Sequence, residues 1–468
     1  MKICVIGLGY IGFPTACVVA RVGHHVLGVD VNSDLLHKLN NGGLHIVNED
    51  GLADLAQSVF ESGHLRVSRI PETADVFILA VPTPYKILAG KEGIQSVCKE
   101  SAAGLIDNGR CVGSSGNEKA SAVEACSIRN QGYGADLSYV EQATREIVPY
   151  VRPGNVIVLE STVSPGTTDK LVRGILEEET GLVCGTDIFI AHAPERVLPG
   201  RLLQELAEND RIVGGVDKQS TERAVSFYRT FVNGDVVGTD ATTAELVKLM
   251  ENTYRDVNIA LANEFALISE KLGTNVFEAI VLANRHPRVN ILTPGPGVGG
   301  HCITVDPYFI VEAVPDKARI ISLARQINSS MPYHVVSLAR SIRNTALESG
   351  TAIRKVVALG ASYKPNVGDE RESPALRIAS LLVHDGYQVS IHDPYISRFS
   401  KNEVTQLLEG SDLLVMLTDH KVYKRQLDPT DVYRRMRNPF VLDTRGFFGT
   451  DWDEAGFYVV RLGVGKRE

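Results

Sequence analysis

The residue best suited to covalent chemistry is Cys302, which lies in a segment made largely of glycine and proline. Residues 294–307 read PGPGVGGHCITVDP. Glycines let a substrate come close to the backbone, and a helix N-terminus or a nearby cation lowers the pKa of a thiol. A helix is expected to begin just after this thiol. These features favour a nucleophilic Cys302, and the alternative is a small buried residue.

Lys248 and Asn252 are four residues apart, a spacing that places both side chains on one face of an expected helix. A lysine on a helix is usually a solvated charge, but the sequence from Lys248 to Asn252 lies on a largely apolar helix. The residues alone leave a solvated and a functional Lys248 both open.

The N-terminal residues predict a dinucleotide site. An apolar strand leads into GLGYIG at residues 7–12, a helical pattern follows, and Asp30 comes 18 residues after the last glycine. In this motif Gly7 permits the tight turn, Gly9 lets a pyrophosphate approach the backbone, and Gly12 lets helix and strand pack closely. The helix N-terminus attracts phosphate. Asp30 would accept hydrogen bonds from ribose hydroxyls and repel a 2′-phosphate, so the pattern favours NAD over NADP.

Polar side chains follow two further expected strands, at 75–81 and 155–160. Thr83, Ser161 and Thr162 lie just beyond the ends of these strands. Because the carboxyl ends of parallel strands form the ligand crevice of an open sheet, we expect these hydroxyls on the cofactor side. They could instead cap the next helix, and the two roles are compatible.

Helix and strand patterns divide the rest of the chain into a helical middle and a second α/β unit. A long helix is predicted over 243–271, which spans about 45 Å at about 1.5 Å per residue. The later predicted segments are helices 317–348 and 373–384 and strands 355–360, 388–393, 412–417 and 439–443. We therefore predict an α/β protein with two Rossmann-like doubly wound domains joined by a central helical domain. The predicted domains are 1–238, 239–345 with Cys302, and 346–468.

Composition limits the classes of function. The chain has 468 residues, 44% of them hydrophobic and 22% charged, as is typical of a globular enzyme, and its net charge of −8 argues against nucleic-acid binding. No apolar run of about 18 residues predicts a membrane span, and the N-terminus reads as a strand rather than a signal peptide. The seven cysteines include no CxxC pair, so we expect a cytoplasmic protein with no metal site.

Taken together, these motifs resemble the UDP-glucose/GDP-mannose dehydrogenase family, and the resemblance covers nearly the whole chain in order. The matching motifs, besides GLGYIG with Asp30, are STVSPGT (161–167), APERVLPG (193–200), KLMEN (248–252), GGHCITVDP (299–307), SYKPNVGDERES (362–373) and VLDTRG (441–446). Within the family, residues 251–264 and 284–302 look most like the subgroup that acts on UDP-N-acetyl-D-mannosamine.

The resemblance implies NAD-dependent, four-electron oxidation of a UDP-sugar at C6, with two NAD per turnover. It also implies a homodimer built through the long helix, or a higher homo-oligomer. It implies that Cys302 forms a thiohemiacetal and then a thioester, that Lys248 and Asn252 stabilise the oxyanion, and that Asp306 positions or deprotonates water. Glu195 and Thr162 complete the expected catalytic set. The expected cofactor residues are Gly7, Gly9, Tyr10, Ile11, Gly12, Asp30, Thr83, Ser161, Thr162 and Arg371. The expected substrate residues are Glu195, Arg196, Lys248, Asn252, Arg255, Arg285, Arg288, Gly299, Tyr363, Lys364 and Arg445.

One stretch departs from the family pattern. Residues 86–135 replace a short loop, and Tyr133 is their only aromatic residue, so they are expected to form a mobile loop or, alternatively, a substrate lid or partner-binding insert. Other functions also remain open. These are the same chemistry on UDP-N-acetylglucosamine, UDP-glucose or GDP-mannose, a two-electron dehydrogenase, and a nucleotide-sugar binder inactivated by this insert.

Overall fold

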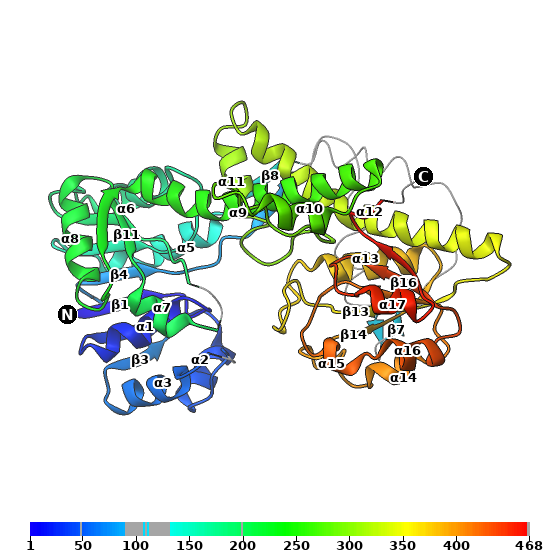
Figure 1. The fold of residues 1–468 in the computed structure, drawn as a ribbon. Helices are drawn as coiled ribbons and strands as arrows, with labels where there is room; N and C mark the ends of the chain where they lie inside the picture. The colour runs from blue at the N-terminus through cyan, green and yellow to red at the C-terminus, as the bar shows by residue number, and fades with distance from the viewer. Residues whose placement is uncertain (47–48, 89–105, 108–109, 112–131, 198–199, 466–468) are drawn as a thin grey trace. The chain divides into compact units, whose positions relative to one another are not determined.

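The computed structural model describes residues 1–46, 49–88, 106–107, 110–111, 132–197 and 200–465 (Figure 1). The chain falls into two compact units. The first comprises Met1–Leu88, Tyr133–Glu251 and Tyr308–Lys317, and the second comprises Ala89–Gly132, Asn252–Pro307 and Ala318–Glu468. The three-domain division expected from the sequence stays a prediction. In the described part of the chain, no helix is both long enough and apolar enough to cross a membrane.

The first unit is built on an eight-stranded sheet with the order β12-β11-β10-β9-β4-β1-β2-β3. Its strands are β1 Lys2–Ile6, β2 His25–Val29, β3 Leu65–Ser68, β4 Val76–Leu79, β9 Val156–Leu159, β10 Phe189–His192, β11 Arg211–Gly215 and β12 Val236–Asp240. All neighbouring strands are parallel except β10 and β11, which are antiparallel. The carboxyl ends of the parallel strands therefore share one edge, where a ligand binds in folds of this class.

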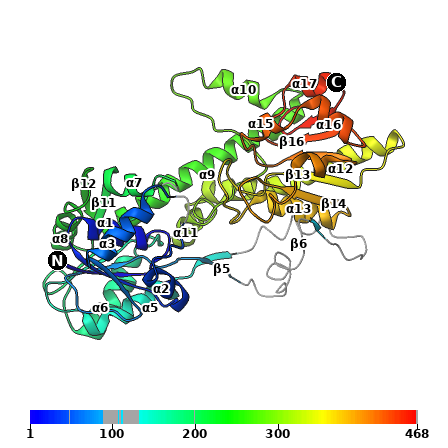
Figure 2. The same cartoon turned by 90° about the horizontal axis from the view of Figure 1, so that it is seen from below.

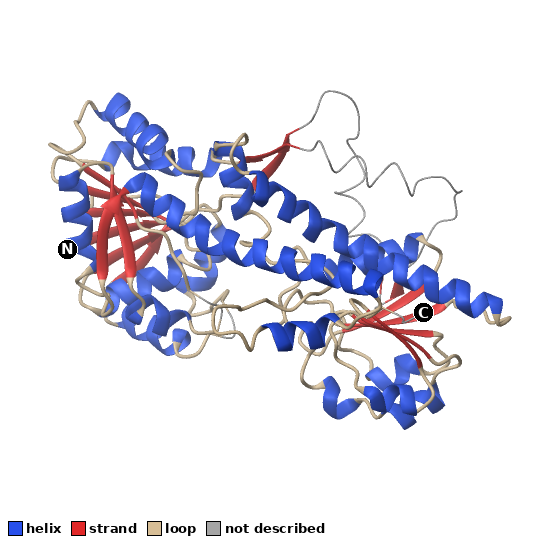
Figure 3. Cartoon of the chain, turned by 45° about the horizontal axis from the view of Figure 1, so that its top comes forward, coloured by secondary structure: helices blue, strands red, loops and turns tan. Residues whose placement is uncertain are grey.

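Helices cover both faces of this sheet (Figure 3). They are α1 Gly12–Arg21, α2 Ser33–Asn40, α3 Leu52–Glu61, α5 Ser138–Ile147, α6 Arg173–Thr180, α7 Leu202–Glu208 and α8 Lys218–Tyr228. Strand residues alternate between two cores, as the period of a strand requires. Ile3 and Val5 of β1 face one apolar cluster, and Cys4 and Ile6 face the other.

The predicted long helix is confirmed as α9, Ala241–Leu272. It is followed by α10 Val276–Ala283, α11 Asp306–Ala313 and α12 Arg319–Glu348. α12 confirms the second predicted helix of the middle segment.

The second unit contains a parallel sheet of β13 Lys355–Leu359, β14 Gln388–His392, β15 Leu413–Met416, β16 Phe440–Asp443 and β17 Tyr458–Arg461. Its helices are α13 Pro374–His384, α14 Val404–Leu408, α15 Tyr423–Gln426, α16 Pro429–Arg435 and α17 Thr450–Glu454. The predicted fold class, with two Rossmann-like sheets and a helical middle, is confirmed. β17 was not anticipated from the sequence.

Short strands occur in the 86–135 stretch. β5 Tyr85–Leu88 pairs with β8 Gly132–Ala135, and β6 Ile106–Asp107 pairs with β7 Arg110–Cys111, which extends the second sheet beyond β14 (Figure 2). The predictions of a mobile loop, lid or partner-binding insert fall largely on residues outside the described ones.

Candidate functional site

The turn at residues 7–12 has the backbone geometry that a dinucleotide needs. Gly7 has a φ of +91°, and a Cβ there would lie 2.6 Å from the carbonyl oxygen of Ala80. A Cβ on Gly12 would lie 2.0 Å from the carbonyl oxygen of Gly7. Around Gly9, in contrast, nothing lies within 4 Å of the Cβ position. The turn is therefore tight on its inner side and open where a pyrophosphate would meet the N-terminus of α1.

Asp30 presents a carboxylate at the end of β2. Its two oxygens accept N–H groups of Leu8 and Asn32, at 2.8 and 2.9 Å, and the residue stays partly exposed. The corresponding acid after β14, Asp393, is fully buried and accepts a hydrogen bond from His420 at 3.0 Å. Burial opposes ionisation of Asp393, but His420 and two backbone N–H groups lower its pKa to about 2. Asp30 thus remains accessible to a ribose, and the first unit fits NAD.

The other predicted cofactor residues of the first unit lie at the same edge. The Ser161 hydroxyl, which follows β9, donates to the carbonyl of Val81 at 2.7 Å. It therefore ties the end of β9 to the chain after β4 and does not cap the following helix. Thr83 and Thr162 are half-buried, as are the two residues before α1, Tyr10 and Ile11. Their contacts with a cofactor stay predictions.

Glu195 lies just after β10, and its carboxylate is held inside the first unit. Its carboxylate is 8% exposed and forms an ion pair with Arg211, the first residue of β11. Its Oε1 also accepts the backbone N–H of Arg196 at 2.6 Å. The Arg196 side chain pairs with Glu251 at 2.7 Å. Both predicted substrate residues are therefore held by opposite charges within the first unit.

Lys248 and Asn252 lie one turn apart on α9, as the spacing predicts, and both are half-buried. Asn252 donates its amide Nδ2 N–H to Oδ2 of Asp306 at 2.5 Å. Asp306 begins α11, is 3% exposed, and donates its backbone N–H to the carbonyl of Cys302 at 2.9 Å. The structure thus joins three of the predicted catalytic residues, Asn252, Asp306 and Cys302, in one chain of hydrogen bonds.

Glycines before Cys302 are required by close packing against the residues after β13. A Cβ on Gly299 would lie 2.6 Å from a backbone carbonyl oxygen and 2.6 Å from Cβ of Tyr363. Gly300 has a φ of +94° and donates its N–H to the carbonyl of Arg371 at 3.0 Å. A Cβ there would lie 2.9 Å from the ring of Tyr363. Residues 299–302, which we call the Cys302 turn, therefore pack directly on the segment that contains Tyr363 and Arg371.

The Cys302 thiol is exposed, and its Sγ lies 4.0 Å from Nδ1 of His301. Arg371 pairs with Asp369 at 2.6 Å. This hydrogen bond is the main cause that raises the pKa of Arg371, and the nearby Cys302 adds to it. A guanidinium near a thiol stabilises the thiolate. The sequence interpretation assigned Arg371 to the cofactor, a role that stays a prediction, but within its own unit the residue lies near the thiol.

The remaining predicted substrate residues of the second unit are basic. Four of them are exposed: Arg255, Arg285, Arg288 and Lys364. Arg445 is half-buried, donates from Nε to Asp419 at 2.9 Å, and lies directly against Gly295. Guanidinium groups suit a diphosphate because they can donate two parallel hydrogen bonds.

A buried polar chain that positions the glycine-rich segment escaped the sequence interpretation. Gly295 donates its N–H to Asn263 at 2.9 Å, and Asn263 donates to Asn328 at 2.9 Å. Asn328 donates to Asp256 at 2.8 Å, and Arg325 donates to the same carboxylate at 2.6 Å. Burial raises the pKa of Asp256 even though Arg325 opposes the shift. Polar residues at one-face spacings on α9 and α12 are the signal that could have found this chain.

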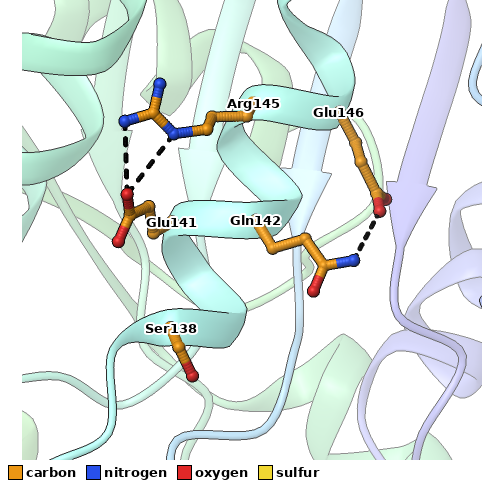
Figure 4. A pocket seen from close by; sticks show the side chains of 5 residues that line it. All are labelled: Ser138, Glu141, Gln142, Arg145 and Glu146. Atoms are coloured by element: carbon orange, nitrogen blue, oxygen red, sulfur yellow. Dashed lines mark hydrogen bonds and ion pairs between the residues drawn. The ribbon is translucent and has the colours of Figure 1, made fainter.

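A shallow hollow on the outer face of α5 carries none of the predicted residues (Figure 4). It is lined by Ser138, Glu141, Gln142, Arg145 and Glu146. Gln142 pairs with Glu146, and Arg145 pairs with Glu141, along the same helix. Among the residues that the structure describes, no group of three or more His, Cys, Asp or Glu side chains could hold a metal ion.

Three domain models of the UDP-glucose/GDP-mannose dehydrogenase family match the chain. The NAD binding domain matches residues 1–108 and 122–232, the central domain matches 242–330, and the UDP binding domain matches 357–450. The gap at 109–121 lies inside the stretch that departs from the family pattern.

Individual relatives match almost the full length of the chain. A UDP-N-acetyl-D-mannosamine dehydrogenase from Methanocaldococcus jannaschii is 43% identical, over 99% of this chain and 97% of its own. An NDP-N-acetyl-D-galactosaminuronic acid dehydrogenase from Ralstonia nicotianae is 40% identical, over 95% of this chain and 96% of its own. The solved structure of a UDP-D-ManNAc dehydrogenase from Pyrococcus horikoshii is 36% identical and superposes with a TM-score of 0.83, covering 100% of both chains.

Proposed function

The chain belongs to the UDP-glucose/GDP-mannose dehydrogenase family, and we propose that it oxidises C6 of UDP-N-acetyl-D-mannosamine to the carboxylate of UDP-N-acetyl-D-mannosaminuronate. The observation that carries the proposal is the Cys302 turn, in which an exposed thiol is held beside Arg371 and linked to Asp306 and Asn252. A two-electron alcohol dehydrogenase has no need of such a thiol. The names of relatives that cover the whole chain support the choice of sugar.

NAD, when bound, supplies the oxidising power by accepting a hydride, and two molecules are required for four electrons. The residues of the chain carry the covalent part. The Cys302 thiolate attacks the C6 aldehyde to form a thiohemiacetal, and oxidation of this adduct leaves a thioester, which water hydrolyses to the carboxylate and the free thiol. Covalent capture retains a reactive aldehyde between the two oxidations.

Asn252, Lys248 and Asp306 have complementary roles in this proposal. The Asn252 amide carries two N–H groups, and one of them is directed at Asp306. The other N–H, together with the Lys248 ammonium, would stabilise an oxyanion on C6. Asp306, oriented by the same hydrogen bond, would hold or deprotonate the hydrolytic water. Resemblance to the family supports a role for Thr162 and Glu195 at the substrate.

Recognition of the substrate is assigned to the basic residues Arg255, Arg285, Arg288, Lys364 and Arg445, with Arg196, Gly299 and Tyr363. We propose that they bind the diphosphate and the sugar, because guanidinium and ammonium groups neutralise phosphate charge. Three of them, Arg255, Gly299 and Tyr363, lie on segments close to the Cys302 turn: Gly299 contacts Tyr363, and Arg255 is near enough to Tyr363 to influence its pKa.

We also propose a homodimer through α9. Six large apolar residues of this helix are exposed: Leu246, Met250, Tyr254, Leu261, Ile268 and Leu272. Their spacings place them in one stripe on the helix, and an exposed apolar stripe of this kind marks an interaction surface. Light scattering on the purified protein should give twice the mass of 50.9 kDa, and Leu261→Glu should give the single-chain mass.

Measurement of NADH release tests the proposal. The substrates are UDP-N-acetylmannosamine, UDP-N-acetylglucosamine, UDP-N-acetylgalactosamine, UDP-glucose and GDP-mannose. We expect two NADH per sugar with the first, and a large loss of acid formation in Cys302→Ala. One NADH per sugar, unaffected by this substitution, would indicate a two-electron dehydrogenase. Preference for another sugar would keep the chemistry and change the substrate. Binding without turnover would indicate a nucleotide-sugar binder.

A further inference from the structure

A buried charged cluster lies at the carboxyl edge of the first sheet, and the chemistry proposed above does not use all of it. Glu160 directly follows β9, and Glu195 follows β10. β11 runs antiparallel to β10, so its first residue, Arg211, returns to the same edge. Tyr228, the last residue of α8, completes the cluster and is 68 positions from Glu160, to which it donates a hydrogen bond.

The contacts in this cluster leave Glu195 with little freedom. Arg211 is 4% exposed and its Nη1 contacts Oε2 of Glu195, while Oε1 accepts the N–H of Arg196. The Arg211 guanidinium is held in turn over the ring of Tyr228, 5.5 Å from its centroid. Tyr228 donates its hydroxyl to Oε1 of Glu160 at 2.6 Å. Glu195 therefore cannot rotate without breaking a buried, charged hydrogen bond, which costs much more than an exposed one.

The charges of the cluster favour pairing of Arg211 with Glu195. One guanidinium faces two carboxylates, and Thr15 and Tyr228 also face Glu160. Burial raises the pKa of Glu160 to about 7, Arg211 opposes this shift, and Glu195 adds to it. Arg211 forms its ion pair with Glu195, whereas Glu160 accepts the hydroxyl of Tyr228, so Glu195 is the direct ion-pair partner of Arg211.

We propose that Arg211 is a positioning residue for the reaction, which holds the Glu195 carboxylate in one orientation toward the substrate. This inference rests on the proposed function, in which Glu195 acts on the UDP-sugar. The role of Arg211 is indirect, because its own side chain is buried beneath Glu195 and contacts Tyr228 on its other side.

A double-mutant cycle tests this role. The variants are Arg211→Gln, Glu195→Gln and the combination of both, with Arg223→Gln as the control. Arg223 belongs to the same unit, is exposed, and lies over the ring of Phe189, at 4.9 Å from its centroid. The measurements are kcat/KM for UDP-N-acetylmannosamine, its Kd by calorimetry, and KM for NAD. Calorimetry needs no turnover, so the cycle can be completed even if a variant is inactive.

If Arg211 acts through Glu195, each single variant should lose about 100-fold in kcat/KM, since small displacements in a site have effects of this size. The kcat/KM of the double variant should be no more than about threefold lower than that of Glu195→Gln, because the two losses share one cause. KM for NAD and the control should change less than about twofold. If the losses of the two single variants multiply in the double variant, and each variant weakens substrate binding by the same factor as it lowers kcat/KM, the role of Arg211 is merely structural. This result would overturn the inference. A wild-type protein that neither binds nor oxidises any of the sugars would overturn the proposed function and this inference with it.

Discussion

Replacing Gly299 by alanine tests whether the Cys302 turn must pack directly on the segment after β13. The added Cβ would lie 2.6 Å from the carbonyl oxygen of Glu372, 2.6 Å from Cβ of Tyr363 and 2.7 Å from Cδ of Pro374. Carbon atoms pack at about 3.5–4.0 Å, so the turn must shift by about 1 Å. None of the three obstacles is the far end of a flexible side chain. A shift of about 1 Å in an active site costs about 100-fold in rate, or about 2.7 kcal/mol in transition-state stabilisation.

The assay is kcat for uronate formation from UDP-N-acetylmannosamine, followed by NADH absorbance and supported by mass-spectrometric alkylation rates at Cys302. Gly299→Ala should lose about 100-fold in kcat, and its unfolding free energy should fall by about 1–3 kcal/mol, the usual cost of overpacking. Gly174→Ala is the matched control, because Gly174 lies in α6 with nothing within 4 Å of its Cβ position. It should be neutral or slightly stabilising. A Gly299→Ala protein with kcat within about threefold of wild type would refute the reasoning.

Three further predictions concern the cofactor turn and the buried charges. Gly9→Ala should leave stability unchanged, because nothing lies near its Cβ position. It should weaken NAD binding by about tenfold or more, because the pyrophosphate needs that space. An unchanged affinity for NAD in calorimetry would contradict this prediction. Burial raises the pKa of Glu160 from 4.5 to about 7, so the folded protein binds this proton more tightly and stability should fall as pH rises from about 4.5 to 7. Glu160→Gln should flatten that dependence in thermal unfolding, and a flat wild-type profile would disprove it. Asp256→Ala removes the carboxylate that neutralises buried Arg325 and should lower the free energy of unfolding by about 3–5 kcal/mol. The double variant Asp256→Leu with Arg325→Met should lose much less, because it leaves no unpaired buried charge. Urea unfolding measures both losses, and equal losses would contradict this prediction.

Local patterns were sufficient to predict the long helices, several strands of both sheets and the cofactor turn. The helix expected over 243–271 is α9, Ala241–Leu272, and the strand expected over 355–360 is β13, Lys355–Leu359. Apolar periodicity and glycine turns depend on residues adjacent in the chain, so they can be recognised without the fold. The same holds for the fold class, because alternating strands and helices leave few topologies open.

The residues that we predict to carry the chemistry were also visible in the sequence, but their partners were not. The side chains of Asn252 and Asp306 are hydrogen-bonded although the two residues are 54 positions apart in the sequence. Arg325 neutralises Asp256, from which it is separated by 69 positions. Such contacts depend on how elements distant in sequence pack, which local patterns do not encode.

The sequence by itself therefore determined most of the main elements, the turn with the dinucleotide motif and the thiol that we predict to react. The tertiary structure decided how those residues are held. Glu195 is a buried, paired carboxylate only because β11 runs antiparallel to β10 and returns Arg211 to its edge. Gly299 must be glycine only because the Cys302 turn packs on Tyr363. In both cases the physical reason is the same: burial and close approach make a charge or a missing side chain indispensable, and both are properties of the packed molecule.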